Sequence, residues 1–178
     1  MEIKKIVTGA LEENCYVLSK DNTCLIVDPG SDAKKIKELV GEDKIIGVLV
    51  THAHFDHIGA LRDFLNMNRR LKIFKKSNLT DLKEVSVGNF KFIPIMTPGH
   101  SSDSVTFYFK DDNAMFVGDF IFRDTVGRCD LPTGSSSEMD KSIEKIKAYD
   151  DSITLYPGHG DETTLGREKQ YNLYFIKE

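Results

Sequence analysis

The sequence has no tryptophan, only five prolines and three cysteines, and no long hydrophobic run. A helix that crosses a bilayer needs roughly 18 or more apolar residues in succession, so we expect no transmembrane segment. Cys15, Cys24 and Cys129 form no CxxC pair, which argues against a disulfide framework. The first residues also lack the uninterrupted apolar stretch of a signal peptide. We therefore expect a cytoplasmic chain, with Cys15 and Cys24 in its core.

Positive charge is not in excess, because the chain has 24 Lys and Arg residues and 28 Asp and Glu residues, for a formal net charge of −4. This balance lacks the basic footprint of a protein that binds nucleic acid or an anionic membrane. At 178 residues and 40% hydrophobic content, the chain can build one well-packed core. It contains no repeat and no low-complexity linker, so we expect a single domain over residues 1–178.

Runs of β-forming residues alternate with helical patterns along the chain. Strands are expected at 3–7, 15–19, 23–27, 45–50, 72–74, 90–96, 105–110, 114–117 and 152–156. Helices are expected from Ser31 or Asp32 to Gly41, at 59–70, at 137–149 and from Thr163 or Thr164 onward. This alternation predicts an α/β fold in which helices cover both faces of a mixed sheet.

A dense group of metal-binding side chains follows the apolar run at 45–50, which is typical of a strand buried on both faces. The string THAHFDH supplies His52, His54, Asp56 and His57. In an extended segment, His52 and His54 point the same way, because side chains alternate with a period of two. Imidazole and carboxylate together suit zinc, and also iron or manganese. The string therefore predicts a metal site at the end of this strand.

Three further ligand-type residues follow other expected strands. His100 and His159 each come after a Pro-Gly turn, in the strings TPGH and YPGH, and Asp119 comes after a Gly. Proline fixes one backbone angle and glycine permits unusual ones, so these turns set the direction of each ring. Seven ligands are too many for one tetrahedral zinc but suit two metals that share a carboxylate.

These residues and several short strings resemble the metallo-β-lactamase fold superfamily. Within it, the chain is most similar to glyoxalase II-like hydrolases in the short form without a C-terminal helical domain. The strings that carry this narrower likeness are ENCY at 13–16, VDPG at 27–30, GRCDLP at 127–132 and YPGHGDETT at 156–164. The resemblance implies a four-layer αββα sandwich, with the site at one edge of two sheets.

The resemblance also implies a role for each ligand. His52, His54 and His100 would hold a first metal, Asp56, His57 and His159 would hold a second, and Asp119 would bridge them. The implied cofactor is two zinc ions per chain, with iron or manganese as alternatives at either position.

A hydroxide held between two such metals would attack the carbonyl of a small thioester or ester substrate. Asp56 is the catalytic candidate, because its carboxylate could orient that hydroxide. Asp28 could orient a ligand histidine or simply form a turn before Pro29. Arg128 could bind a substrate carboxylate or pair with a neighbouring acid.

A thioester hydrolase of the hydroxyacylglutathione type is the leading functional prediction. The sequence also resembles persulfide dioxygenases, in which His52, His100 and Asp119 would bind one iron and leave positions for oxygen. A lactonase or esterase is a variant of the first reading, and a β-lactamase fits the local strings less well. A metal-stabilised binding module is the non-enzymatic alternative. The oligomeric state does not follow from the sequence.

Overall fold

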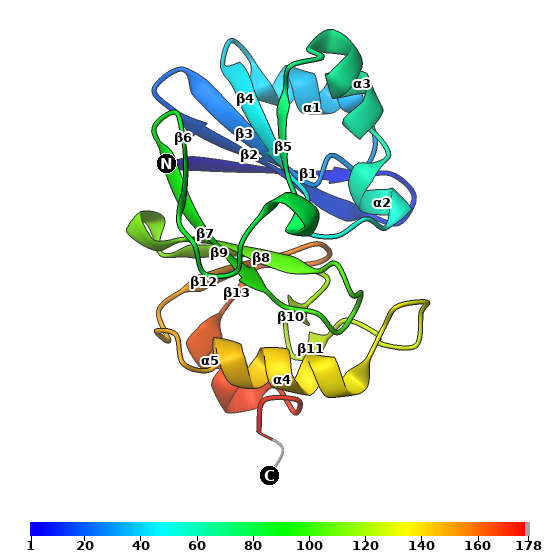
Figure 1. The fold of residues 1–178 in the computed structure, drawn as a ribbon, viewed down its shortest axis with the longest axis vertical. Coiled ribbons are helices and arrows are strands. Elements are labelled where there is room, and N and C mark those ends of the chain that lie inside the picture. The colour runs from blue at the N-terminus through cyan, green and yellow to red at the C-terminus, as the bar shows by residue number, and fades with distance from the viewer. Residues whose placement is uncertain (177–178) are drawn as a thin grey trace.

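The computed structural model describes residues 1–176, in which two β-sheets pack face to face between outer helices (Figure 1). The first sheet has the order β1 (Glu2–Thr8), β2 (Glu13–Lys20), β3 (Thr23–Val27), β4 (Lys44–Leu49) and β5 (Lys72–Phe74). The second has the order β13 (Thr163–Thr164), β12 (Thr154–Pro157), β9 (Ala114–Gly118), β8 (Val105–Phe109), β7 (Phe90–Met96) and β6 (Val85–Val87). A small ribbon pairs β10 (Ile121–Phe122) with β11 (Thr125–Val126).

Helices cover the outer face of each sheet. They are α1 (Ala33–Val40), α2 (Phe55–Ile58), α3 (Leu61–Met67), α4 (Ser136–Ile146) and α5 (Leu165–Tyr171). Ile36 of α1 and Phe64 of α3 are buried against the first sheet, and Ile143 of α4 and Leu165 of α5 against the second. A third apolar cluster fills the space between the sheets and contains Phe107. These three cores confirm the four-layer αββα order.

Most expected elements form close to their predicted positions. Asp21 and Asn22 both have positive φ, at 50° and 58°, which suits the tight turn between β2 and β3. Cys15 and Cys24 are fully buried, as predicted. The helix expected to begin at Ser31 or Asp32 is α1, although Asp32 makes no side-chain capping bond.

Two expectations about local structure were wrong. The helix expected at 59–70 is the shorter α3, because residues 55–58 already form α2 and Asn68 adopts an extended conformation. The strands β6, β10, β11 and β13 were not expected, because segments of two or three residues are too short to show a period of two.

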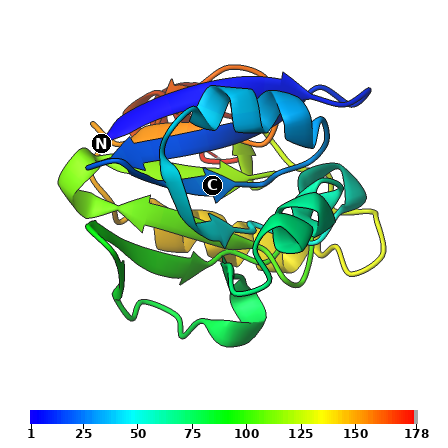
Figure 2. The same ribbon diagram turned by 90° about the horizontal axis from the view of Figure 1, so that it is seen from above.

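The strand ends converge at one edge of the sandwich. β3 runs parallel to β4, and β9 runs parallel to β12, so the carboxyl ends of each pair lie together. The turn between β1 and β2, helix α2 and the loop before α4 lie at this same edge in both views (Figures 1 and 2). Within residues 1–176, no helix has the length and apolar character that spanning a membrane requires.

Candidate metal centre

Three histidines converge at the junction of the two sheets. The ring atoms His52 Nε2 and His54 Nδ1 lie 3.1 Å apart, and His100 Nε2 lies 2.9 Å from His54 Nδ1. His52 and His54 come from the extended segment after β4, while His100 follows β7 in the other sheet. Their three ring nitrogens form a group that can hold a metal ion.

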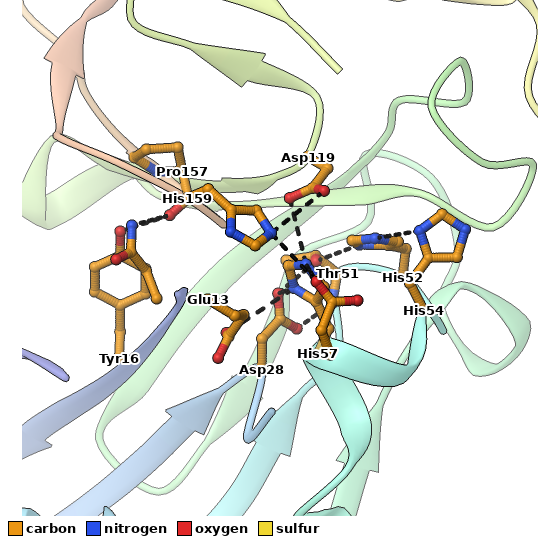
Figure 3. A network of polar contacts seen from close by, with 12 residues as sticks. Glu13, Tyr16, Asp28, Thr51, His52, His54, His57, Asp119, Pro157 and His159 are labelled. Carbon is orange, nitrogen blue, oxygen red and sulfur yellow. Dashed lines mark hydrogen bonds and ion pairs between the residues drawn. The ribbon is translucent and has the colours of Figure 1, made fainter. Parts of the chain in front are cut away.

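A second group lies beside the first and contains Asp56, His57 and His159. Asp56 Oδ2 lies 3.7 Å from His57 Nε2 and 3.3 Å from His159 Nε2. Asp119 stands between the two groups (Figure 3): its Oδ1 lies 3.3 Å from His57 Nε2 and its Oδ2 lies 3.5 Å from His100 Nε2. All seven ligand-type residues predicted from the sequence therefore meet in one cluster.

Three histidines make a hydrogen bond through Nδ1, which leaves Nε2 of each ring facing the cluster. His100 Nδ1 lies 2.8 Å from the carbonyl oxygen of Arg128, which can only accept, so the ring donates from Nδ1. His57 Nδ1 likewise lies 3.0 Å from a carboxylate oxygen of Asp28. His52 Nδ1 lies 3.1 Å from the hydroxyl of Thr51. A hydrogen bond at one ring nitrogen fixes which nitrogen remains free as a ligand.

Asp28, at the edge of the first sheet, hydrogen-bonds to Thr51 after β4 and to His57 in α2 (Figure 3). Its carboxylate accepts from the Thr51 amide at 2.7 Å, from the Thr51 hydroxyl at 2.5 Å and from His57 Nδ1 at 3.0 Å. Because the Thr51 hydroxyl donates to Asp28, it is free to accept from His52. The position of Asp28 is therefore that of a residue that orients a ligand histidine, rather than only a turn former.

The loop that carries His159 is held from the opposite sheet by β2. The Asn14 side-chain amide donates to the carbonyls of Pro157 and Gly160, at 3.0 and 2.9 Å. The Tyr16 hydroxyl donates to Pro157 at 2.7 Å. Position 158, between Pro157 and Gly160, requires glycine, because a Cβ there would lie 2.3 Å from Asp119 Oδ1.

Burial keeps two histidines of the first group, His52 and His54, neutral. Burial lowers the pKa of His52 to about 2, and the neighbouring His57 and His100 add to this effect. Burial also lowers the pKa of His54. Neutral imidazole is the form that binds metal, so these two rings need lose no proton before binding.

Carboxylates dominate around the second group. Burial opposes protonation of His57, but its contacts with Asp119 and Asp28 outweigh burial and raise its pKa well above the usual value. Asp119 is buried too, yet His57 and His52 hold its pKa well below the usual range. Glu13 lies behind this group with its Oε1 3.9 Å from His57 Nδ1, and burial together with Asp28 raises its pKa to about 9.

The donor set fits metal ions. His57 Nε2 and Asp119 Oδ1 are buried, face the cluster and lie 3.3 Å from each other, and neither makes a well-formed hydrogen bond among residues 1–176. Buried polar atoms normally make hydrogen bonds. Buried atoms without them therefore indicate that a metal ion, which accepts their lone pairs, can bind here. In a tetrahedral site with metal–nitrogen distances near 2.0–2.1 Å, ligand atoms lie about 3.3 Å apart. The spacings in the histidine group, 2.9 and 3.1 Å, are close to that value.

The remaining two candidates lie beside the cluster. Arg128 borders the cavity over the metal-binding residues and pairs with Asp130 through two hydrogen bonds of 2.7 Å, so the acid-pair interpretation describes its contacts here. Cys129 is half-buried and directs its Sγ to the carbonyl of Gly127 at 3.5 Å.

Fold and site together define a metal-binding αββα protein, and comparison with known proteins names its family. The family model of the metallo-beta-lactamase superfamily matches residues 8–67 and 70–159, and the chain belongs to that superfamily. The Probable metallo-hydrolase YqgX of Bacillus subtilis (strain 168) is 32% identical, over 97% of this chain and 96% of its own length.

Solved structures show the same likeness. The crystal structure of BLEG-1 B3 metallo-beta-lactamase superposes with a TM-score of 0.93 at 29% identity, over 99% of this chain and all of that one. The crystal structure of TTHA1623 in a di-iron-bound form has a TM-score of 0.86 at 26% identity, over 96% and 99% of the two chains. The superfamily resemblance is thus confirmed, while the narrower glyoxalase II-like likeness stays a prediction.

Sequence reasoning anticipated a supporting role for Asp28 but missed other residues that hold the candidate ligands in place. Thr51 and Asn14 were part of quoted strings, but no role was expected for either. No contact was expected for Asp103, although its Oδ2 accepts from the Ala53 amide at 3.1 Å, between His52 and His54. A polar residue directly before the first histidine was a signal for Thr51, whereas nothing local marks Asn14 or Asp103.

Proposed function

We propose that this chain is a metal-dependent hydrolase that cleaves thioesters of the hydroxyacylglutathione type, with two zinc ions as its cofactor. The observation that carries the proposal is the position of Asp119, whose two oxygens face His57 in one ligand group and His100 in the other. A shared carboxylate between two ligand groups is typical of two-metal hydrolytic sites. The relative YqgX, a probable metallo-hydrolase, and the di-iron form of TTHA1623 support the same class of site.

In this proposal each candidate ligand is assigned to a metal by the group in which it lies. His52, His54 and His100 would hold one metal, Asp56, His57 and His159 would hold the other, and Asp119, which faces both groups, would be shared between them. When bound, such a metal pair lowers the pKa of water toward 7 and polarises a carbonyl oxygen.

The chain's own groups orient the reactants around that centre. Asp56 borders the cavity and is 15% exposed at its side chain, so its carboxylate can accept a hydrogen bond from the attacking water. Asp28 keeps the Nδ1 proton of His57 engaged and leaves Nε2 free to bind. Hydrolysis adds this water across the acyl–sulfur bond, and the products are a carboxylic acid and a thiol.

A second candidate uses fewer of these residues. His52, His100 and Asp119 form a two-histidine, one-carboxylate set of the kind that binds iron in oxygenases. The Oδ2 of Asp119 lies 3.5 Å from His100 Nε2, which places two members of this set together. It gives no metal-binding role to the other four ligand-type residues, which favours the hydrolase; these are His54, Asp56, His57 and His159. Lactones and other esters remain alternative substrates for the hydrolase itself.

The test measures metal content and turnover on the same sample. Protein purified without chelators or a metal-binding tag is analysed for zinc, iron and manganese. It is then assayed with S-lactoylglutathione, a lactone, a β-lactam and, in an oxygen electrode, glutathione persulfide. Two metals per chain with thioester cleavage support the proposal. Oxygen consumption with one iron supports the dioxygenase, and a fully metallated protein that leaves thioesters intact overturns the proposal.

A further inference from the structure

A cavity of about 760 Å³ opens directly over the ligand cluster. His54, Asp56, His100, Asp119 and His159 form its floor. Apolar side chains from three separate segments form part of its walls: Leu11 from the β1–β2 turn, Phe55 from α2, and Leu131 and Pro132 from the loop before α4.

Two of these apolar side chains are unusually exposed. Phe55 is 74% exposed and Leu11 is 53% exposed. Water contact with large apolar side chains is unfavourable by roughly 25 cal/mol per Å², and exposed apolar surface that lines a cavity commonly marks a binding site. Phe55 also lies between the ligand-type residues His54 and Asp56, so whatever covers it sits next to the reacting atoms.

Apart from the metal ions proposed for its floor, the same cavity has few cationic side chains to offer a negatively charged substrate. Among the described residues that line it, Arg128 is the one Lys or Arg, and its guanidinium is already engaged by Asp130. Asp103 adds a carboxylate to the wall. Lys76 and Lys5 lie near the rim, where each donates to a backbone carbonyl, of Ser102 and Gly160 respectively.

A second cavity of about 370 Å³ meets the first at the cluster. It shares His100, Asp119, Arg128 and His159 with the larger one and adds Phe122 to its lining. A thioester has two arms, one on each side of its reacting carbonyl. Two cavities that meet at the metal-binding residues can therefore receive one arm each.

We infer that the preferred substrate is an uncharged thioester with an apolar arm of several carbons, which lies against Phe55 and Leu131 in the larger cavity. This inference rests on the thioester hydrolysis of the proposed function and differs from it in the thiol, which is a neutral group in place of glutathione. Glutathione carries two carboxylates and an ammonium group, and the cavity has no unpaired cation among its described lining residues to receive the carboxylates. The glutathione thioester of a given acid is therefore a poorer substrate than a neutral thioester of the same acid.

The experiment compares kcat/KM within matched pairs, using the metal-loaded full chain. S-hexanoyl- and S-acetyl-N-acetylcysteamine differ only in acyl length, and S-benzyl thioacetate places the apolar arm on the thiol side. At least one apolar-arm thioester is expected to exceed the S-acetyl compound by about tenfold, since an apolar pocket discriminates strongly by added carbon. S-hexanoylglutathione, compared with S-hexanoyl-N-acetylcysteamine, tests charge and is expected to be cleaved about tenfold less efficiently.

Two variants tie these ratios to the named residues. Phe55→Ser should reduce the apolar-arm advantage to about twofold. Met67→Ser, which changes another exposed apolar side chain that lies outside the cavity, should leave the ratio unchanged. Asp130→Asn frees Arg128 and should raise kcat/KM for the glutathione thioester without changing that for the neutral one.

The outcomes separate this inference from the proposed function. Equal rates for acetyl and apolar-arm substrates, or a preference for the glutathione thioester, would overturn the inference while leaving thioester hydrolysis intact. No cleavage of any thioester by metal-loaded protein would overturn both.

Discussion

Asn14 holds the backbone on both sides of His159. Its side-chain amide donates to the carbonyl of Pro157 at 3.0 Å and to that of Gly160 at 2.9 Å. Asn14 lies on β2 of the first sheet, while the loop that carries His159 follows β12 of the second. The position of one candidate metal ligand thus depends on a contact between the two sheets.

Replacing Asn14 with alanine is expected to weaken the second metal position selectively. Each carbonyl loses its Asn14 donor and keeps one other, the Tyr16 hydroxyl for Pro157 and the Lys5 ammonium group for Gly160. A change in such supporting contacts typically reduces metal affinity by about 10–100-fold. Metal content after dialysis should fall toward about one ion per chain, with a loss of about 1–3 kcal/mol in stability. Elemental analysis and urea unfolding measure the two effects. The control is Asn89→Ala, which removes one exposed bond to Asp21. Retention of both metals by the Asn14 variant would show that the contact does not position His159.

The ligands themselves were predictable because each follows a local pattern. THAHFDH comes directly after an apolar strand, and His100 and His159 share a Pro-Gly turn, so a short window of sequence contains the signal. The layer order was not available from such windows and came from family resemblance. Asn14 and Pro157 are 143 positions apart, and no periodicity in either segment indicates that they meet. Hydrogen bonds across two sheets follow from the packing of the whole chain.

Asp28→Asn is expected to impair the site while leaving the fold intact. An amide at this position retains one acceptor for the Thr51 amide but places a second donor beside His57 Nδ1, which already donates. Since His57 loses its carboxylate partner, metal affinity and kcat/KM should each fall about 10–100-fold. Chelator competition and steady-state kinetics test this expectation, with Asp63→Asn on α3 as the control. Unchanged affinity in the Asp28 variant would assign this carboxylate to the turn alone.

Gly30→Ala is expected to displace the segment that carries Asp56. A Cβ on Gly30 would lie 1.8 Å from the backbone oxygen of Asp56, and backbone cannot move aside as a flexible side chain can. Overpacking of this kind is unfavourable by about 1–3 kcal/mol and occasionally more. Urea unfolding and metal binding should therefore both weaken.

Gly41→Ala provides the contrast for that variant. Gly41 has a φ of 65° but open space around its Cβ position, so its replacement introduces backbone strain without a clash. With a ψ of −130° Gly41 lies outside the left-handed helical region, so its replacement should reduce stability by about 1–3 kcal/mol and leave metal binding unchanged. If Gly30→Ala behaved in the same way, the close approach between Gly30 and Asp56 would have no importance for the site.

The ion pair between Asp81 and Lys145 should make a small, pH-dependent contribution to stability. Burial opposes ionisation of Asp81, but Lys145 Nζ at 2.7 Å and the Met96 amide at 2.8 Å outweigh it and hold the pKa of Asp81 below its usual value. Because the folded-state pKa is depressed, the contribution is complete above the unfolded value of about 3.9 and disappears as the pH falls through the folded value.

Asp81→Asn isolates that contribution. The Asp81 side chain is 41% exposed, so solvent screening limits the expected destabilisation at pH 7 to about 0.2–1 kcal/mol. The difference in unfolding free energy between the two proteins should stay constant from pH 7 to about 5 and shrink below about 4. Urea unfolding across this range measures it, with the exposed Asp111→Asn as the control. A difference that persisted at low pH would mean that the amide perturbs packing, because an ion pair cannot contribute once the carboxylate is protonated.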